Sequence, residues 1–329
     1  MRFVVLGAGA VGGVVGARLA GHGHDVVLIA RDAHYEANRN NGLHIESPDD
    51  AITLKITVVD HPSKISWTSD DVLLLATKTQ DTEAALDTLA AVAPPALPIF
   101  CAQNGVANER MATHRFANVY GVFVWCPADY LTPGVVRVWC APKSGILHGG
   151  CYPPGVDALS EQVAAAFRDA TFYADAKADI MRWKYRKLLS NLGNAVDALC
   201  GTAARGSGIA QRARREGIAC LEAAGISHVA DDEDDAARLE REVHPRTING
   251  EERRGGSSWQ SLERRLGTIE TDYLNGEIVR LGQTHGVQTP VNALLQYLSQ
   301  RVAREGRPPG SVDPDKILIA LDLRQQPLQ

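Results

Sequence analysis

The sequence has few of the patterns that mark a metal site, a membrane span or a nucleic-acid-binding surface. Its six cysteines are scattered without a CxxC pair, and its ten histidines form no HExxH motif. We therefore expect no metal site and a reducing compartment. No apolar run approaches the roughly 18 residues that a membrane span needs. Lysine and arginine total 34 against 39 acidic residues, and this net charge of -5 predicts no nucleic-acid partner.

The chain also lacks internal repeats and low-complexity segments. Its first apolar run begins at Arg2, so we expect no signal peptide and a cytoplasmic protein with no membrane partner. A length of 329 residues favours two domains over one.

The first thirty residues carry a glycine-rich turn in a specific context. The apolar run Arg2–Leu6 leads into the turn, a helical pattern covers Val11–His22, and a second apolar run covers Asp25–Ala30. A strand, a glycine turn, a helix and a strand in this order make a GxGxxG match a strong indication of dinucleotide binding. The candidate cofactor-binding residues of the turn are Gly7, Ala8, Gly9, Ala10, Val11 and Gly12.

Each glycine of this turn has a physical role. Gly7 allows the tight turn, Gly9 lets the backbone approach a pyrophosphate, and Gly12 lets the helix pack closely on the strand. The free N–H groups at the start of the helix then face the phosphates.

The end of the second strand indicates which dinucleotide binds. A site for NAD usually has an acidic residue there, whereas a 2′-phosphate requires a basic one. The residue is Arg31, and Lys78 follows another apolar run, Val72–Ala76. The pair favours NADP(H). Asp32 leaves an alternative open, because a shift of one residue would direct its carboxylate to the ribose.

The periodicity changes along the chain. Strand patterns dominate the first half and long helical patterns the second, which predicts an α/β doubly wound sheet of the Rossmann type over residues 1–177 and an all-α domain over 178–329. We expect the active site in the cleft between the two domains. The further strand candidates are Thr53–Val59, Val72–Ala76, Pro98–Cys101, Val119–Trp125, Val135–Trp139 and Gly145–His148. The helical candidates of the second half are Ile180–Cys200, Ile209–Ala224, Asp232–Val243 and Trp259–Gln283.

Two groups of polar residues are candidates for binding and catalysis. Asn104 follows a predicted strand end, where it would reach the nicotinamide or the substrate, although an Asn-Gly turn is an equal alternative. Lys187, Asn191 and Asn194 are spaced i, i+4 and i+7 and would share one face of a helix. A lysine beside two amides suits proton donation to a carbonyl oxygen. The alternative is a solvated basic face that includes Lys184 and Arg186.

A third group lies in the segment that follows. Ser258 is near a helix start after two glycines, and Glu270 lies twelve residues further on. If one helix covers both, twelve residues amount to about three and a third turns, so the two side chains would lie along neighbouring strips.

Taken together, these motifs resemble the ketopantoate reductase (2-dehydropantoate 2-reductase) family over nearly the whole chain. The matching segments are GAGAVGG at Gly7–Gly13, ATKTQDT at Ala76–Thr82, QNGV at Gln103–Val106, KLLSN at Lys187–Asn191, the serine pair Ser257–Ser258, and IETDYLNGEIVRLGQTHGVQTP at Ile269–Pro290. The resemblance implies a Rossmann domain and a helical domain like the C-terminal domain of 6-phosphogluconate dehydrogenase. It also implies NADPH-dependent reduction of 2-dehydropantoate to pantoate in pantothenate biosynthesis.

The resemblance assigns roles to these residues. Lys187 matches the family's catalytic lysine and Glu270 its acidic partner, which either orients the lysine or binds a substrate hydroxyl. The matches to cofactor-proximal and substrate-binding residues are Asn104, Asn191 and Ser258, and those to the 2′-phosphate contacts are Arg31 and Lys78.

The chain departs from the family in several places, which include the charged stretch near Asp231. Ala195 fills the position of a second helix amide, and Asn194, one residue earlier, is taken as the substrate-binding replacement. Trp259 stands where the family often has methionine, and the tail at 307–329 has no clear counterpart.

Two other functions remain open: a related oxo-acid or 3-hydroxy-acid dehydrogenase with another substrate, and a catalytically silent NADP-binding sensor. The presence of both Lys187 and Glu270 argues against the sensor, which would need only the glycine turn. The long C-terminal helices would suit a homodimer.

Overall fold

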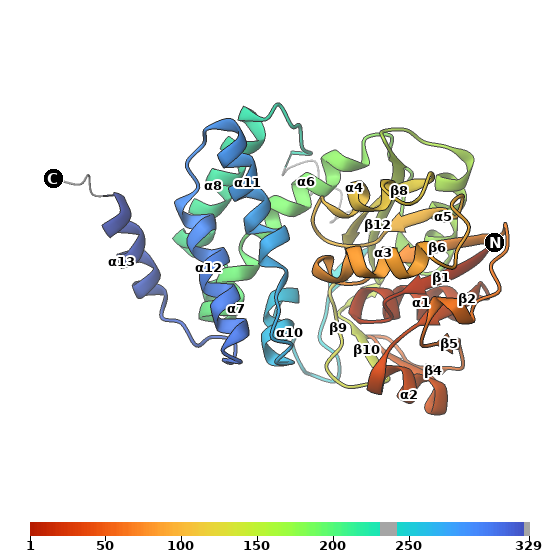
Figure 1. Cartoon of the computed structure of the whole chain (residues 1–329). Coiled ribbons are helices and arrows are strands. Elements are labelled where there is room, and N and C mark those ends of the chain that lie inside the picture. Colours follow the sequence, from red (N-terminus) through yellow and green to blue (C-terminus); the bar gives the residue numbers. More distant parts are fainter. Residues whose placement is uncertain (231–241, 326–329) are drawn as a thin grey trace. The chain divides into compact units, whose positions relative to one another are not determined.

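The computed structural model describes residues 1–230 and 242–325, which form two compact units (Figure 1). The first unit is Met1–Lys184 with Val229–Arg253, and the second is Tyr185–His228 with Arg254–Gln329. Val229–Arg253 returns to the first unit because strand β14 (Val243–Pro245) pairs with β11 (Cys140–Pro142). The domain limits 1–177 and 178–329 stay a prediction.

The first unit is built on an eight-stranded sheet of order β13-β12-β8-β7-β6-β1-β2-β5. Its strands are β1 (Arg2–Leu6), β2 (Asp25–Ile29), β5 (Thr57–Val59), β6 (Asp71–Leu75), β7 (Ile99–Cys101), β8 (Val119–Trp125), β12 (Gly145–Tyr152) and β13 (Phe172–Tyr173). Neighbouring strands run parallel except β8 and β12, which are antiparallel. The parallel register aligns Leu6 with Ile29 on one side and with Leu75 on the other, so these strands end at one edge.

Helices cover both faces of this sheet, because its central strands are apolar on both sides. In β1, Phe3 and Val5 pack on one face with α1 (Ala10–Gly21) and α5 (Ala158–Asp169). Val4 and Leu6 pack on the other face with α3 (Thr82–Ala90) and α4 (Asn108–Thr113). The predicted doubly wound Rossmann-type sheet is confirmed.

A second, four-stranded sheet in this unit has the order β4-β3-β10-β9. Its strands are β3 (Leu43–Glu46), β4 (Ala51–Leu54), β9 (Ala128–Asp129) and β10 (Val135–Val138). The predicted single strand Thr53–Val59 is wrong. The segment contributes to two strands in different sheets, because β4 pairs with β3 whereas β5 pairs with β2. The predicted strand Val135–Trp139 corresponds to β10, which pairs with β3 and β9 in this second sheet and not with the strands of the large one.

The second unit is helical in its described residues, as predicted (Figure 1). Its elements are α7 (Asn194–Cys200), α8 (Gly208–Ala223), α10 (Ser257–Glu263), α11 (Asn275–His285), α12 (Pro290–Arg304), α13 (Pro314–Gln325) and the short 3-10 helices η3 (Thr202–Ala204) and η4 (Glu270–Tyr273). Helix α6 (Ile180–Asn191) contains residues of both units. No helix of the described chain combines the length and the apolar character that a membrane crossing requires.

Two predicted helices are wrong as continuous elements. Ile180–Cys200 is interrupted between Asn191 and Asn194, where α6 ends and α7 begins. Trp259–Gln283 is interrupted after α10, where Arg265 and Gly267 have φ angles of 51° and 71°, outside the helical region. Most of the predicted helix Asp232–Val243 lies outside the described residues, and its last residue belongs to β14.

Candidate functional site

The glycine-rich turn of the first unit has the geometry expected for a dinucleotide phosphate site. Gly7 has φ of 100°, and a Cβ there would lie 2.8 Å from the Thr77 backbone nitrogen, so only glycine fits. At Gly12 a Cβ would meet the Gly7 carbonyl and lie 2.9 Å from the Ala76 Cβ, which explains its role in close packing. A Cβ on Gly9 would meet only Tyr130, at 3.9 Å.

This turn also leaves donors for an anionic group. Gly9 is the N-cap of α1 and provides no side-chain cap, so the first N–H groups of the helix donate no hydrogen bond to a capping side chain. Donors at a helix start, with an uncrowded Gly9 before them, fit a pyrophosphate. Gly7, Gly9 and Gly12 would hold the cofactor there.

The remaining cofactor candidates follow strands that end level with the turn. Arg31 follows β2 and begins α2 (Asp32–Asn41), and it is exposed without an ion pair among the described residues. Asp32 beside it is exposed and has φ of 53°. Lys78 follows β6 and is half-buried at the start of the 3-10 helix η2 (Thr79–Asp81). The structure therefore brings Arg31 and Lys78 to the same edge of the sheet, on either side of the glycine turn.

Asn104 belongs to the same edge and is linked to the Lys78 segment. Its backbone carbonyl accepts hydrogen bonds from Thr79 Oγ1 at 3.4 Å and from Asn108 Nδ2 at 3.1 Å. Gln103 donates through its amide to the Thr77 carbonyl at 2.9 Å and to Thr82 Oγ1 at 2.8 Å. The sequence does not predict the bonds that join Asn104 to Thr79 and Gln103 to Thr77 and Thr82, because these residues lie more than twenty positions apart.

The two lysines of α6 have different surroundings. Lys184 is 2% exposed, and its Nζ lies 2.6 Å from Glu109 and 3.0 Å from the Gln103 carbonyl oxygen that accepts its hydrogen bond. Burial raises the pKa of the neighbouring Cys101 thiol, so this cysteine is not a reactive thiolate. Lys187, one turn later, is half-buried. Because Lys184 and Arg186 are buried, the alternative of a solvated basic face is wrong for both.

The break between α6 and α7 changes the predicted arrangement of the amides. Asn191 is the last residue of α6 and Asn194 the first of α7, so the two do not continue one helical face with Lys187. Both side chains are buried, at 4% and 3% exposure. The i, i+4, i+7 spacing was therefore a correct indication of a shared face only for the pair Lys187 and Asn191.

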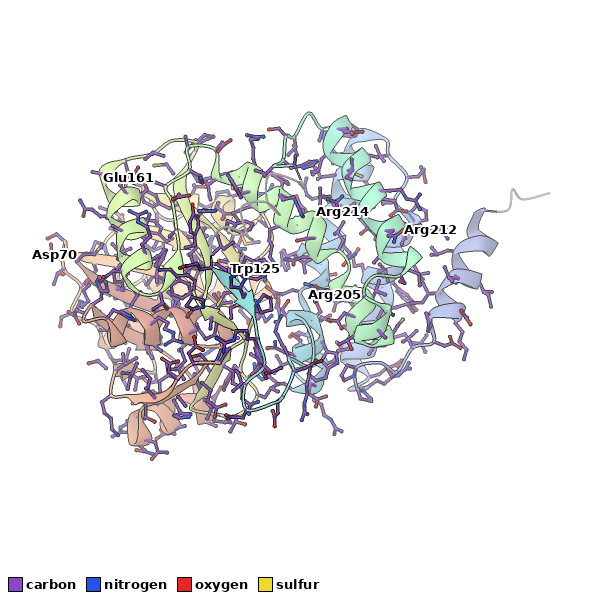
Figure 2. The ribbon with its side chains drawn as sticks, turned by 180° about the vertical axis from the view of Figure 1, so that it is seen from behind. Asp70, Trp125, Glu161, Arg205, Arg212 and Arg214 are labelled. Atoms are coloured by element: carbon purple, nitrogen blue, oxygen red, sulfur yellow. The ribbon has the colours of Figure 1, made fainter. Side chains whose placement is uncertain are left out.

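Asn194 lies beside the start of α10, which carries Ser258. Its Oδ1 accepts a hydrogen bond from Arg205 Nη2 at 3.1 Å and lies 3.3 Å from the Cβ position of Gly256. Arg205 is labelled in Figure 2. The Gly256 N–H donates to Asp197 Oδ2 at 2.8 Å, which fixes α10 against α7. Ser258 is 2% exposed, and its hydroxyl has no hydrogen-bond partner among the described residues.

Glu270 starts η4 and is 4% exposed. The expected continuous helix from Ser258 to Glu270 is wrong, so the two side chains do not lie along strips of one helix. Instead, η4 is held by α12, because Gln300 donates to the Ile269 carbonyl at 3.0 Å. Asn275, five residues after Glu270, donates to the Leu192 carbonyl at 3.2 Å. This bond links the Glu270 segment to the residue that follows Asn191.

A metal site is not part of this arrangement. No group of three or more His, Cys, Asp or Glu side chains with a suitable geometry occurs within 1–230 and 242–325. The absence of a bound metal stays a prediction.

Comparison with known proteins identifies both units. Residues 3–146 match the family described as ketopantoate reductase PanE/ApbA, and residues 179–303 match the ketopantoate reductase PanE/ApbA C-terminal family. A curated 2-dehydropantoate 2-reductase of Halobacterium salinarum is 30% identical over 320 residues, which are 93% of this chain and 100% of the relative.

Solved structures show the same fold. A PanE/ApbA family ketopantoate reductase from Ralstonia eutropha has a TM-score of 0.76 and 28% identity, over 93% of this chain and 99% of that one. D-mandelate dehydrogenase, solved with NADH and anilino(oxo)acetate, has a TM-score of 0.79 at 23% identity over the same shares of the two chains. At that identity the second similarity concerns the fold alone.

Proposed function

Because the chain belongs to the ketopantoate reductase family, an enzymatic family of NAD(P)-dependent oxidoreductases, we propose that it reduces a 2-oxo acid to a 2-hydroxy acid with NADPH. The proposed substrate is 2-dehydropantoate, which would place the enzyme in pantothenate biosynthesis. The proposed reaction needs both units, since the glycine turn lies in the first and Lys187 and Glu270 lie in the second.

One observation supports this proposal above the others. Lys187, the buried Asn191 and the buried Glu270 belong to segments that one side chain, Asn275, connects through the Leu192 carbonyl. A cofactor-binding sensor has no need for a lysine, an amide and a carboxylate that are fixed in this way. A reductase needs them to bind a carbonyl substrate and to deliver a proton.

The proposed roles follow from charge. When bound, NADPH supplies the hydride that the carbonyl carbon accepts. Lys187 stabilises the negative charge that grows on the carbonyl oxygen and donates the proton to it. Glu270 keeps this lysine charged or accepts a hydrogen bond from a substrate hydroxyl. Ser258, Asn191 and Asn194 donate to the carboxylate, and Asn104 lies on the cofactor side with the glycine turn.

Arg31 and Lys78 are the proposed contacts of the 2′-phosphate. Both are cations at the edge that carries the glycine turn, and the exposed Arg31 has no ion pair among the described residues to compete with a phosphate. Asp32, the alternative ribose contact, would favour NADH. A direct titration with the two nucleotides distinguishes these assignments.

The experiment that tests the function is a steady-state screen of NADPH oxidation with 2-dehydropantoate, 2-oxoisovalerate and benzoylformate. We expect 2-dehydropantoate to give the highest kcat/KM, and chromatography of the product should identify pantoate. Lys187→Ala is the inactive control. NADPH binding without oxidation by any oxo acid would favour the sensor.

A different 2-oxo acid is the second candidate, for one reason. Trp259, next to Ser258, is half-buried and packs its ring against Gly255, so it occupies space where a smaller side chain would leave room. A higher kcat/KM for benzoylformate or 2-oxoisovalerate would support this candidate and retain the reductase chemistry.

A further inference from the structure

The imidazole of His34 forms hydrogen bonds through both of its nitrogens. His34 lies on α2, three residues after Arg31, and is 6% exposed. The Gly134 backbone N–H donates to Nδ1 at 3.0 Å, and Nε2 lies 2.6 Å from the Ala8 carbonyl oxygen. A backbone N–H can only donate and a carbonyl can only accept, so Nδ1 is unprotonated and Nε2 carries the proton. The ring is therefore neutral in this arrangement.

The carbonyl that accepts from His34 belongs to the glycine turn. The Ala8 C=O and the Gly9 N–H are parts of one planar trans peptide, so they point in opposite directions. A hydrogen bond that fixes the Ala8 carbonyl toward His34 therefore directs the Gly9 N–H away from the ring. Gly9 is also the N-cap of α1, where the donors for a pyrophosphate begin.

Neighbouring residues hold the ring in place. The Tyr130 ring lies 4.3 Å from the His34 ring, between centroids, and its Cδ1 lies 3.9 Å from the Cβ position of Gly9. Gly134 and Tyr130 both belong to the connection between β9 and β10. His34 thus joins this connection, the glycine turn and the first turn of α2, which starts after Arg31.

We propose that neutral His34 is a positioning residue for the dinucleotide: it sets the Ala8–Gly9 peptide for the pyrophosphate and fixes the turn relative to the start of α2, where Arg31 is proposed to meet the 2′-phosphate. The inference rests on the proposed use of NADPH. It requires a donor at the position of Nε2, and a general loss of packing would not depend on that donor.

Substitution of His34 by glutamine or by asparagine distinguishes the loss of the donor at Nε2 from a general loss of packing. A glutamine amide extends about as far from the backbone as Nε2, so the variant His34→Gln can keep the donor to Ala8. An asparagine amide reaches only to the level of Nδ1, so His34→Asn keeps a partner for the Gly134 N–H and loses the donor to Ala8. His34→Ala removes both, and His61→Gln is the matched control at an exposed histidine in the same unit.

The measurement is the Kd for NADPH by fluorescence titration of the full chain without substrate, with thermal unfolding of each variant alongside. We expect His34→Gln and His61→Gln to bind like wild type, and His34→Asn and His34→Ala to bind at least about fivefold more weakly, the ratio expected for one hydrogen bond. The KM for NADPH should rise by a similar factor while kcat at saturating NADPH stays the same.

Equal Kd values for the glutamine and asparagine variants, both folded, would overturn the proposal. If His34→Ala does not fold, the comparison of Gln with Asn decides alone. Wild type that prefers NADH would overturn the proposed cofactor instead, and the Gln–Asn comparison would then be made with NADH, which carries the same pyrophosphate.

Discussion

Removal of the Asn275 side chain should lower the stability of the second unit and the proposed catalytic activity, and it should leave NADPH binding at the glycine turn unchanged. Asn275 Nδ2 donates to the Leu192 carbonyl at 3.2 Å and to Asn292 Oδ1 at 2.9 Å. Leu192 lies in the gap between α6 and α7. Asn292 starts the next link, because its own amide donates to Glu216 on α8 at 2.7 Å. One buried amide therefore connects the starts of α11 and α12 with the end of α6.

The size of the effect follows from the groups left behind. In Asn275→Ala, the carbonyl of Leu192 and the Oδ1 of Asn292 lose this donor, and both residues are fully buried. An orphaned buried acceptor costs about 1–3 kcal/mol, so two acceptors cost about 2–6 kcal/mol. Asn275 Oδ1 is itself buried with no partner among the described residues, and its removal offsets part of this cost. We expect a loss of about 2–4 kcal/mol in the free energy of unfolding.

Denaturant unfolding measures this loss of stability. The Kd for NADPH and the kcat/KM for the oxo acid show which unit the substitution affects. The Kd for NADPH should stay the same, because the glycine turn belongs to the other unit, whereas kcat/KM for the oxo acid should fall. Asn40→Ala, at an exposed position, is the control and should change stability by no more than about 0.5 kcal/mol. A loss below about 1 kcal/mol for Asn275→Ala would refute the claim that this amide holds the segments together.

Four further outcomes can be checked with standard assays. Arg31→Ala should reduce a preference for NADPH over NADH of about tenfold to a hundredfold, since a charge-assisted contact is worth about 1.5–3 kcal/mol; equal wild-type Kd values for the two nucleotides would exclude the 2′-phosphate contact. Lys187→Ala should lower kcat by about 10² to 10⁴ with an unchanged Kd for NADPH, and near-normal turnover would contradict its role as proton donor. Glu270→Ala should remove most of the difference in kcat/KM between 2-dehydropantoate and 2-oxoisovalerate, which lacks the hydroxyl, if the carboxylate accepts from it; a retained difference would assign Glu270 to the lysine. The Arg18 guanidinium donates two hydrogen bonds to the Asp50 carboxylate, at 2.7 and 3.0 Å, and lowers its pKa. The Asp50 carboxylate therefore stabilises the fold above the unfolded pKa of about 3.9, and this stabilisation is lost as the pH falls through the lowered folded-state pKa. Asp50→Asn should therefore flatten the acid limb of stability against pH, and an unchanged limb would count against the pair.

The glycine turn between β1 and α1 could be predicted from the sequence because its causes are local. Gly7 has a positive φ, and a Cβ on Gly12 would meet the Gly7 carbonyl five residues earlier, so the turn itself requires both glycines. The strands on either side are marked by their own apolar runs. The positions of Arg31 and Lys78 followed from parallel register, since strands that pair with β1 end at the same edge. For these residues, short-range pattern and sheet geometry were sufficient.

The second unit was less predictable because its helix ends depend on distant residues. The run from Trp259 to Gln283 has a helical pattern throughout, yet α10 ends where Arg265 and Gly267 adopt positive φ. Similarly, Asn191 and Asn194 have helical spacing, but an amide eighty-three positions later, Asn275, binds the carbonyl between them. The spacing of apolar residues predicts a helical face. It does not predict where a distant side chain binds a backbone carbonyl at the end of a helix.

The two lysines of α6 show how burial assigns roles that spacing cannot. Lys184 and Lys187 lie about one turn apart on α6, and the sequence pattern favours Lys187 but predicts a solvated face as the alternative for Lys184. Lys184 is enclosed by Glu109 and by backbone carbonyls of the β7 and β8 segments, which lie more than sixty positions away in the sequence. A buried lysine side chain needs a partner of opposite charge, and Glu109 Oε1 lies 2.6 Å from Lys184 Nζ. This enclosure argues against Lys184 as the group that protonates a substrate. Lys187 is half-buried, and its role as the proton donor stays a proposal that the alanine variant tests.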